Sequence, residues 1–519
     1  MLTRMMMITL NSKNILLTRQ AVSFNSSDDL SNVNISLSSP FSSNGSPIEF
    51  YKNVTIGLSD IEFNNVFNNK SGGSYRYVDP LQTIYTNNTL FNNSHSRSEG
   101  GSMYFDTYAL VFITNCSYAN SSSVSKGGSL SVKTLSNFSL TDSNFGRSIS
   151  GDIGGSVFID SPYAYITKNW FEMTNSSNNG GCISVLASLN QKYYINDCYF
   201  GFCISINGYG GAIFVQTTVA SYVSVIGSTF FSCKSATGGG AIYLTTTGTA
   251  LSIELLKLCI SQCHLLLSSS SYLGSAIYFS AGTMDCLSTF QHLSLFNNGL
   301  ISYSTGMIYA FKNQHNFLAI NSTKCIGLSY GFAYFRNLYY GLYRYFNIIS
   351  TVSQECVYFS SETSDFSIDF EHSNIINNTC SSINIRAHHP SSKFTIKNCI
   401  LINNSNYLLY GSGGTQMAKN CYIIHTGSFF RSFTTEAIIN TTINTETILI
   451  THYSTYLCIT PLELGVLEIP CQTIPDVDPC QTLPVPQTTC LLVTHEGGFS
   501  LNSLSTVLHL ALSSLINTY

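Results

Sequence analysis

Three carboxylates on one predicted strand come closest, in this 519-residue chain, to the spacing of an acid–base pair. Asp365, Asp369 and Glu371 alternate with apolar residues, so period-two alternation puts them on one outward face. The basic residues expected beside them one repeat later are Arg386, His388 and His389. Close carboxylates on such a scaffold hold a cation or divide acid and base roles, as in polysaccharide lyases and hydrolases.

The alternative is an exposed charged strip that pairs with its neighbours. The polygalacturonase-like set of N-T-D, D-D, G-H-G and R-x-K is missing, and the one Asp-Asp pair, Asp28-Asp29, lies far from the strip. We therefore predict a charged strip, no enzyme, no catalytic or cofactor-binding residue and no cofactor. A carbohydrate-active lyase or hydrolase at the strip stays as the second hypothesis.

Cys203, Cys233 and Cys263 are the cysteines with the most regular spacing, thirty residues each. In a repeating fold this spacing predicts a vertical ladder, in which adjacent rungs lie within disulfide reach. Either a buried thiol stack or a disulfide fits the pattern, and the pairing of the 17 cysteines stays open. A zinc site needs paired C-x-x-C spacing with histidine, which is absent, so we expect no metal ligands.

Aromatic residues crowd the segment between Tyr330 and Phe346, with Arg336 and Arg344 among them. The full set is Tyr330, Phe332, Tyr334, Phe335, Tyr339, Tyr340, Tyr343, Tyr345 and Phe346. Exposed aromatic faces stack on sugars or form hot spots for protein partners. Packing of the rings between neighbouring repeats is the alternative.

A repeat must position all of these residues. Gly-Gly, a small residue and an alternating apolar triplet recur at Gly100-Gly101, Gly127-Gly128, Gly154-Gly155, Gly180-Gly181, Gly210-Gly211 and Gly239-Gly240, with variants at Gly72-Gly73 and Gly274-Ser275. The intervals are 28, 27, 27, 26, 30, 29 and 35 residues. A second element, F-N-N or F-x-x-C, lies a little before each glycine pair, as in Leu90–Asn93 and Phe200–Cys203. The glycines suit a tight corner that needs a positive φ or a close backbone approach.

Period-two alternation makes the segments after the glycines strands with one apolar face. The other face is expected to be a mixed, wetted set: Tyr104, Ser131, Phe158, Ser184, Phe214, Tyr243 and Tyr278. Short strands repeating at this interval predict an all-β, single-stranded parallel β-helix, a pectin-lyase-like solenoid in which matching residues stack about 4.8 Å apart. About fourteen rungs fit between Ala21 and Thr460 at this spacing.

Gly210-Gly211-Ala212-Ile213 and Gly239-Gly240-Ala241-Ile242 resemble the GGA-[ILV] half of the repeat in polymorphic outer membrane proteins and in related surface proteins of parasitic protists. The resemblance covers roughly 60–410. It implies a right-handed β-helix displayed on a surface, with adhesion to host cells as its role. The residues after Thr460 leave no room for the translocator domain of a bacterial member, which favours the protist type.

Composition indicates the domain limits and argues against a nucleic-acid-binding protein. Charged residues make up 10% of the chain, and the net charge is −4, so a nucleic-acid partner is not expected. Six of the eleven prolines follow Thr460, together with Cys471, Cys480 and Cys490. We predict an N-terminal segment or cap at 1–20, a β-helix repeat domain at 21–460, and a stalk or disordered tail at 461–519.

Localisation rests on weaker signals. Seventeen cysteines favour an extracytoplasmic compartment, although the start of the chain is no convincing signal peptide and no uninterrupted apolar run is long enough to span a membrane. The sequence thus predicts a non-enzymatic cell-surface or secreted β-helix, an adhesin for a host protein, matrix or glycan, whose oligomeric state stays open.

Overall fold

The computed structural model describes residues 62–443 with short gaps, and short strands between residues 6 and 59. The gaps are 80–82, 188–190, 219–220, 249–250, 268–273, 282–285, 301–305, 362–366, 390–392, 412–413, 426, 428, 432–434 and 440. The chain divides into two compact units, Met1–Glu468 and Ile469–Tyr519, and every described residue belongs to the first. The predicted tail at 461–519 therefore lies outside the described residues.

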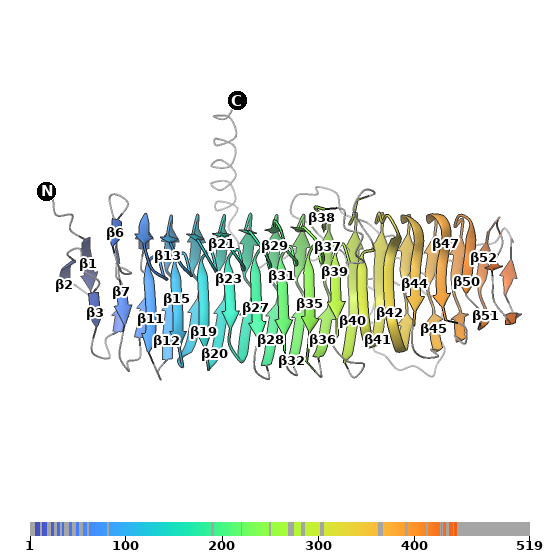
Figure 1. The fold of residues 1–519 in the computed structure, drawn as a ribbon, viewed down its shortest axis with the longest axis horizontal. Coiled ribbons are helices and arrows are strands. Elements are labelled where there is room, and N and C mark those ends of the chain that lie inside the picture. The colour runs from blue at the N-terminus through green and yellow to red at the C-terminus, as the bar shows by residue number, and fades with distance from the viewer. Residues whose placement is uncertain are drawn as a thin grey trace, which may run out of the picture. The chain divides into compact units, whose positions relative to one another are not determined.

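Parallel strands stacked as a β-solenoid make up the described part, which contains no helix (Figure 1). The strands that follow the glycine corners form the first column: β11 (Tyr75–Asp79), β15 (Met103–Thr107), β19 (Leu130–Thr134), β23 (Val157–Asp160), β27 (Ile183–Ala187), β31 (Ile213–Thr217), β35 (Ile242–Thr246) and β39 (Ile277–Ser280). Each pairs in parallel with the equivalent strand of the next repeat, as in Met103↔Leu130 and Leu130↔Val157. The predicted all-β parallel solenoid is confirmed, while its handedness and its number of rungs stay predictions.

Further columns complete each rung. The second column contains β12 (Thr83–Asn87), β16 (Leu110–Thr114), β20 (Asn137–Thr141), β24 (Tyr163–Thr167), β28 (Gln191–Asn196), β32 (Ser221–Ile226) and β36 (Leu251–Leu256). The third contains β13 (Leu90–Asn92), β17 (Ser117–Ala119), β21 (Asn144–Gly146), β25 (Trp170–Glu172), β29 (Tyr199–Gly201), β33 (Thr229–Phe231) and β37 (Cys259–Ser261). A separate nine-stranded sheet of very short strands runs beside them from β6 (Phe41–Ser43) to β38 (His264–Leu265).

Later rungs merge these columns into longer strands. The merged strands are β40 (Leu287–Phe296), β41 (Ile308–Thr323), β42 (Tyr330–Arg344), β44 (Val352–Ser360) and β47 (Thr379–His388). Shorter strands, among them β45 (Ser367–Glu371), β48 (Lys393–Lys397), β50 (Tyr407–Gly411) and β51 (Thr415–Lys419), continue the stack. The first column continues through these later rungs, because Ile308 pairs with Ala333 and Ala333 with Val357.

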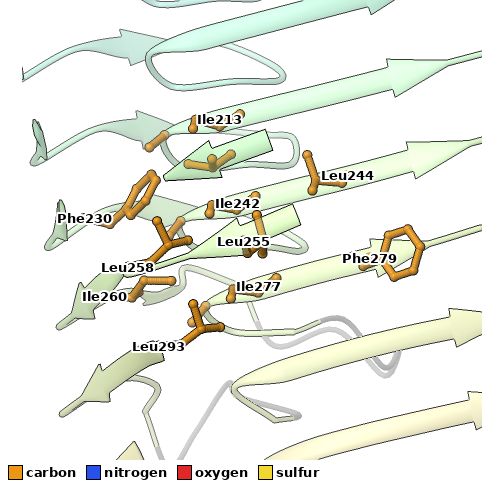
Figure 2. Close-up of a cluster of buried hydrophobic side chains, with 14 of the residues drawn as sticks. Ile213, Phe230, Ile242, Leu244, Leu255, Leu258, Ile260, Ile277, Phe279 and Leu293 are labelled. Carbon is orange, nitrogen blue, oxygen red and sulfur yellow. The ribbon is translucent and has the colours of Figure 1, made fainter. Parts of the chain in front are cut away.

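The core is one continuous spine of stacked apolar side chains. Ile213, Ile242 and Ile277 occupy equivalent positions on three successive rungs and lie one above another in Figure 2. All three are buried, and burial of each such side chain stabilises the fold by about 1.5–3 kcal/mol. In the third column the rings of Phe63, Phe91, Tyr118, Phe145, Phe171, Phe200 and Phe230 stack with neighbouring centroids 4.5–5.1 Å apart.

The two glycines of each corner serve different purposes. The first adopts a left-handed conformation, with φ of +65° at Gly127 and +69° at Gly154. The second is approached by the next rung: a Cβ at Gly128 would lie 2.0 Å from the carbonyl oxygen of Gly155. Both reasons for glycine that the sequence suggested are therefore found, one at each position, and the glycines align in a column.

Side chains at another corner tie each rung to the rung before it. The Ser143 hydroxyl accepts a hydrogen bond from the backbone N–H of Cys116, 27 residues earlier, at 3.0 Å. Asn298 Oδ1 accepts one from the backbone N–H of Cys263 at 2.8 Å. Each rung thus receives part of its backbone hydrogen bonding from the following rung.

The outward side of the first column differs from the expectation of a wetted face. Tyr104, Ser131, Phe158, Ser184 and Phe214 are buried, and only Tyr243 and Tyr278 stay half-buried. Side chains from the segments before the glycine corners cover this column. Ser131 donates to the Glu99 carboxylate at 2.9 Å, and Lys126 Nζ lies 4.6 Å from the centroid of the Phe158 ring.

The N-terminal segment contains β1 (Met6–Leu10) and β2 (Lys13–Leu17), which pair antiparallel. β1 also pairs antiparallel with β5 (Asn34–Ile35). The proposed limits of the cap and of the repeat domain stay predictions. Among the described residues, no helix has the length and apolar character that crossing a bilayer requires.

Candidate functional site

Asp369 and Glu371, the described carboxylates of the predicted strip, which we call the acidic strip, are paired with cations from the neighbouring rungs. Glu371 accepts from Arg344 Nε at 2.8 Å and from Lys397 Nζ at 3.0 Å. Lys397 also lies 3.4 Å from Asp369, while Asp365 lies outside the described residues. Partial burial raises the pKa of Glu371, but the Lys397 hydrogen bond and the Arg344 charge outweigh it and hold the pKa below its usual value.

A carboxylate held ionised by two cations cannot serve as a general acid near neutral pH. The expected neighbours are also placed elsewhere: Arg386 and His388 belong to β47, in line with the first column, whereas Asp369 and Glu371 belong to β45, in line with the second. The interpretation as a charged strip paired with its neighbours fits this arrangement. The prediction that Arg386 lies beside the strip is wrong.

Arg386 instead pairs with Glu355, which sequence reasoning missed. The Arg386 Nη1–Glu355 Oε1 distance is 2.7 Å, and Glu355 is 5% exposed. The guanidinium lies between the rings of Tyr358 and Tyr410, 4.8 and 5.2 Å from their centroids. Burial raises the pKa of Glu355, and the Arg386 charge opposes that shift only in part. Arg386 thus stands between two tyrosines of an outward row that runs on both sides of it, and this packing indicates a structural role.

The predicted cysteine ladder is found as a stack of free, buried thiols. Cys203, Cys233 and Cys263 have no exposed surface, and Cys233 Sγ lies 3.4 Å from the Phe200 carbonyl oxygen of the preceding rung. Burial raises the pKa of Cys203 and of Cys233 well above its usual value, so both thiols stay protonated. They fill the core as small apolar side chains. Among the described residues, no three or more His, Cys, Asp or Glu side chains are arranged to hold a metal ion.

The described rings of the aromatic segment from Tyr330 to Phe346 pack against neighbouring rings, with Tyr345 half-buried against His372. Phe332, Phe335, Tyr343 and Phe346 are buried in the core. Tyr330 and Tyr334 pack with Tyr309 and Tyr358 in a second buried cluster. The described side chains of this segment support the packing alternative; those of Tyr339 and Tyr340 lie outside the described residues.

A different group of tyrosines is exposed, on the outward side of the second column. We call it the tyrosine face and define it by the outward residues of β12, β16, β20, β24, β28 and β32. The three rows are Thr83, Leu110, Asn137, Tyr163, Lys192 and Tyr222; Tyr85, Phe112, Ser139, Tyr165, Tyr194 and Ser224; and Asn87, Thr114, Thr141, Thr167, Asn196 and Ile226. Tyr85 is 50% exposed and Tyr165 39%.

The tyrosine face is almost uncharged, because Lys192 is the one ionisable group at neutral pH in its three rows. Its rings contact one another: Tyr165 and Tyr194 stack with centroids 4.7 Å apart, and Tyr163 lies 4.9 Å from Tyr165. A hydrogen bond with Tyr165 and some burial raise the pKa of Tyr163, so this phenol stays neutral. Period-two alternation in Tyr163–Thr167 was the sequence signal that could have found this face.

The chain matches no family model, no curated protein and no solved structure. The resemblance of its glycine motifs to surface-protein repeats stays an expectation drawn from those motifs.

Proposed function

We propose that this chain is a non-enzymatic cell-surface or secreted β-solenoid, an adhesin that binds a host protein, matrix or glycan partner through a lateral face. The tyrosine face is the observation that carries the proposal. Tyrosine gives a large contact area with a polar tip, which suits a surface that is both wet and adhesive.

Contiguous exposed aromatic side chains are uncommon on soluble proteins without a binding role. Here they lie on neighbouring strands, with Thr and Asn side chains along one margin. The paired carboxylates of the acidic strip speak against the second hypothesis, a polysaccharide-active enzyme, because Glu371 is held ionised by Arg344 and Lys397.

The test is a binding assay with the purified full chain on host cells, extracellular-matrix proteins and a glycan array. The variant Tyr85→Ala/Tyr165→Ala/Tyr194→Ala is expected to lose at least about tenfold in affinity, since exposed aromatic residues dominate such contacts. The matched control, Val124→Ala/Ile206→Ala, removes two exposed apolar side chains outside the tyrosine face and is expected to bind as the parent does. Equal binding by both variants would overturn the proposal, as would cleavage of a polysaccharide that is abolished by Asp369→Asn.

A further inference from the structure

The middle row of the tyrosine face has a regular interruption. Two rings, a serine, two rings and a serine follow one another on successive rungs: Tyr85, Phe112, Ser139, Tyr165, Tyr194 and Ser224. Ser139 therefore stands between two ring pairs. It is half-buried, whereas Ser224 is buried and donates to Glu254 at 3.2 Å.

Ser139 has one ring of each pair on its neighbouring rungs, Phe112 on one side and Tyr165 on the other, and Tyr163 packs against Tyr165 at a tilt of 54°. Tyr85 and Phe112 stack with centroids 5.3 Å apart and an interplanar angle of 12°, and Tyr165 and Tyr194 stack at 4.7 Å and 10°. These separations are close to the spacing of the rungs, so the rings lie across the axis of the stack. We infer that the outer face of the Phe112 ring points toward that of the Tyr165 ring across the rung that carries Ser139.

Phe112 and Tyr165 are two rungs apart, which corresponds to roughly 9.5 Å at strand spacing. A ring in van der Waals contact with both walls needs roughly 7–8 Å, from two carbon–carbon contacts of 3.5–4.0 Å. A puckered pyranose ring, which is thicker than a flat ring and carries C–H groups on its faces, fits the larger gap better than a flat aromatic ring does.

The base of this gap is polar and neutral. Asn137, Ser139 and Thr141 point outward from β20 and present an amide and two hydroxyl groups. The outward residues of the flanking strands β16 and β24 include no Asp, Glu, Lys or Arg. Exposed charges follow directly at the ends of β20 and β24, at Asp142 and Lys168, but none lies in the three rows of these strands, where the hydroxyl groups of an uncharged sugar find hydrogen-bond partners.

We propose that Phe112, Ser139 and Tyr165 form a subsite for one pyranose unit of an uncharged polysaccharide, held between two aromatic rings. The proposal rests on the proposed function and deepens it, because it names the chemical class of the partner and the rung that recognises it. Asn137 and Thr141 position the sugar hydroxyls, and the stacked partners Tyr85 and Tyr194 keep the two walls upright.

The experiment titrates the purified full chain calorimetrically with neutral hexasaccharides of glucose, mannose, galactose and N-acetylglucosamine, and with an oligogalacturonate as the anionic comparison. We expect binding of at least one neutral oligosaccharide and none of the anionic one. Ser139→Phe completes the aromatic row and closes the gap, and is expected to weaken that binding at least about tenfold.

Thr289→Phe is the matched control, because it adds the same ring in the same row on β40, away from both ring pairs. It is expected to bind as the parent does, and circular dichroism with thermal unfolding checks that both variants fold. The subsite is overturned if the parent binds no neutral oligosaccharide, if it prefers the anionic one, if Ser139→Phe binds like the parent, or if Thr289→Phe loses binding equally. Cell or matrix binding that persists in any of these cases leaves the proposed function standing.

Discussion

The second column of strands carries two chemically different outward surfaces, one neutral and rich in tyrosine and the other charged. From β12 to β32 its outward positions carry Tyr, Thr, Asn and Ser, with rings stacked on rings. From β42 to β51 the same positions carry Arg344, Glu371, Asp369 and Lys397, joined across rungs by ion pairs. Most inward positions are apolar in both regions, and the buried polar exceptions include Thr86 in β12 and Gln416 in β51. Because the core and the corners specify the stack, the outward residues are free to differ, and the two surfaces are expected to depend differently on pH and salt.

The largest effect is expected inside the glycine-cornered rungs. Gly155→Ala puts a Cβ 2.0 Å from the carbonyl oxygen of Gly181, so backbone must shift, and we expect a loss of about 3–5 kcal/mol in the free energy of unfolding. Gly146→Ala is the control, since its Cβ meets nothing closer than 4.0 Å, and about 1 kcal/mol or less is expected. Urea unfolding measures both. Equal effects would show that the corners do not limit the stability of these rungs.

The next largest loss of stability is expected on breaking the buried Glu355–Arg386 ion pair in the later rungs. Arg386→Met leaves Glu355 buried without a counter-charge, and a loss of about 3 kcal/mol at neutral pH is expected. The raised pKa of Glu355 means that its contribution is fully present below its unfolded pKa and is lost as the pH rises through its folded value. The deficit of the variant should therefore shrink as the pH falls. Glu355→Gln/Arg386→Met should recover part of the loss, and a deficit that does not change with pH would contradict this account.

A smaller effect is expected at the charged surface. Glu371→Gln removes the shared acceptor of Arg344 and Lys397 and should cost about 1 kcal/mol at neutral pH. Because the folded pKa of Glu371 is lowered, its stabilisation is present above the unfolded pKa and is lost as the pH falls through the folded value. The difference between the parent and the variant should therefore shrink as the pH falls below the unfolded pKa of a glutamate, about 4.3. High salt should also narrow their difference; a gap that persists in acid would rule out the electrostatic origin.

The smallest effect on stability is expected at the tyrosine face. Tyr165→Ser removes a 39% exposed ring and should change the free energy of unfolding by less than about 1 kcal/mol, with no dependence on pH between 5 and 8. Thermal unfolding beside Glu371→Gln measures the contrast directly. If Tyr165→Ser cost more than Glu371→Gln, the stacked rings would be part of the stabilising structure and the difference between the two surfaces would fail.

The sequence predicted the features that repeat. Equivalent residues stack in this fold, so the glycine corners, the apolar strand positions and the ladder of Cys203, Cys233 and Cys263 could be placed from spacing alone. The first column continues where the glycine pairs end, since Ile277 pairs with Ile308 and Ile308 with Ala333.

Features that depend on irregular pairing could not be found this way. The pairing with β42 is irregular between Glu355 and Val357, so counting by twos assigns Glu355 to the core side with Val357 and hides its pairing with Arg386. The burial of Phe158 and Ser131 depends on side chains of a preceding loop, whose course alternation does not specify. Tyr163 and Tyr165 were visible as alternating residues, but no motif distinguished their strand from its neighbours.

In the corner hydrogen bonds that run from one rung to the next, the acceptor side chain is synthesised after the donor N–H. The N–H of Cys116 donates to the Ser143 hydroxyl, which is synthesised 27 residues later. The N–H of Cys263 likewise donates to Asn298, which follows it in the chain. A nascent chain therefore completes each coil only after the following one has been synthesised. We therefore expect folding during translation to proceed one coil behind synthesis, with an incomplete edge at the growing end for the next segment to pair with.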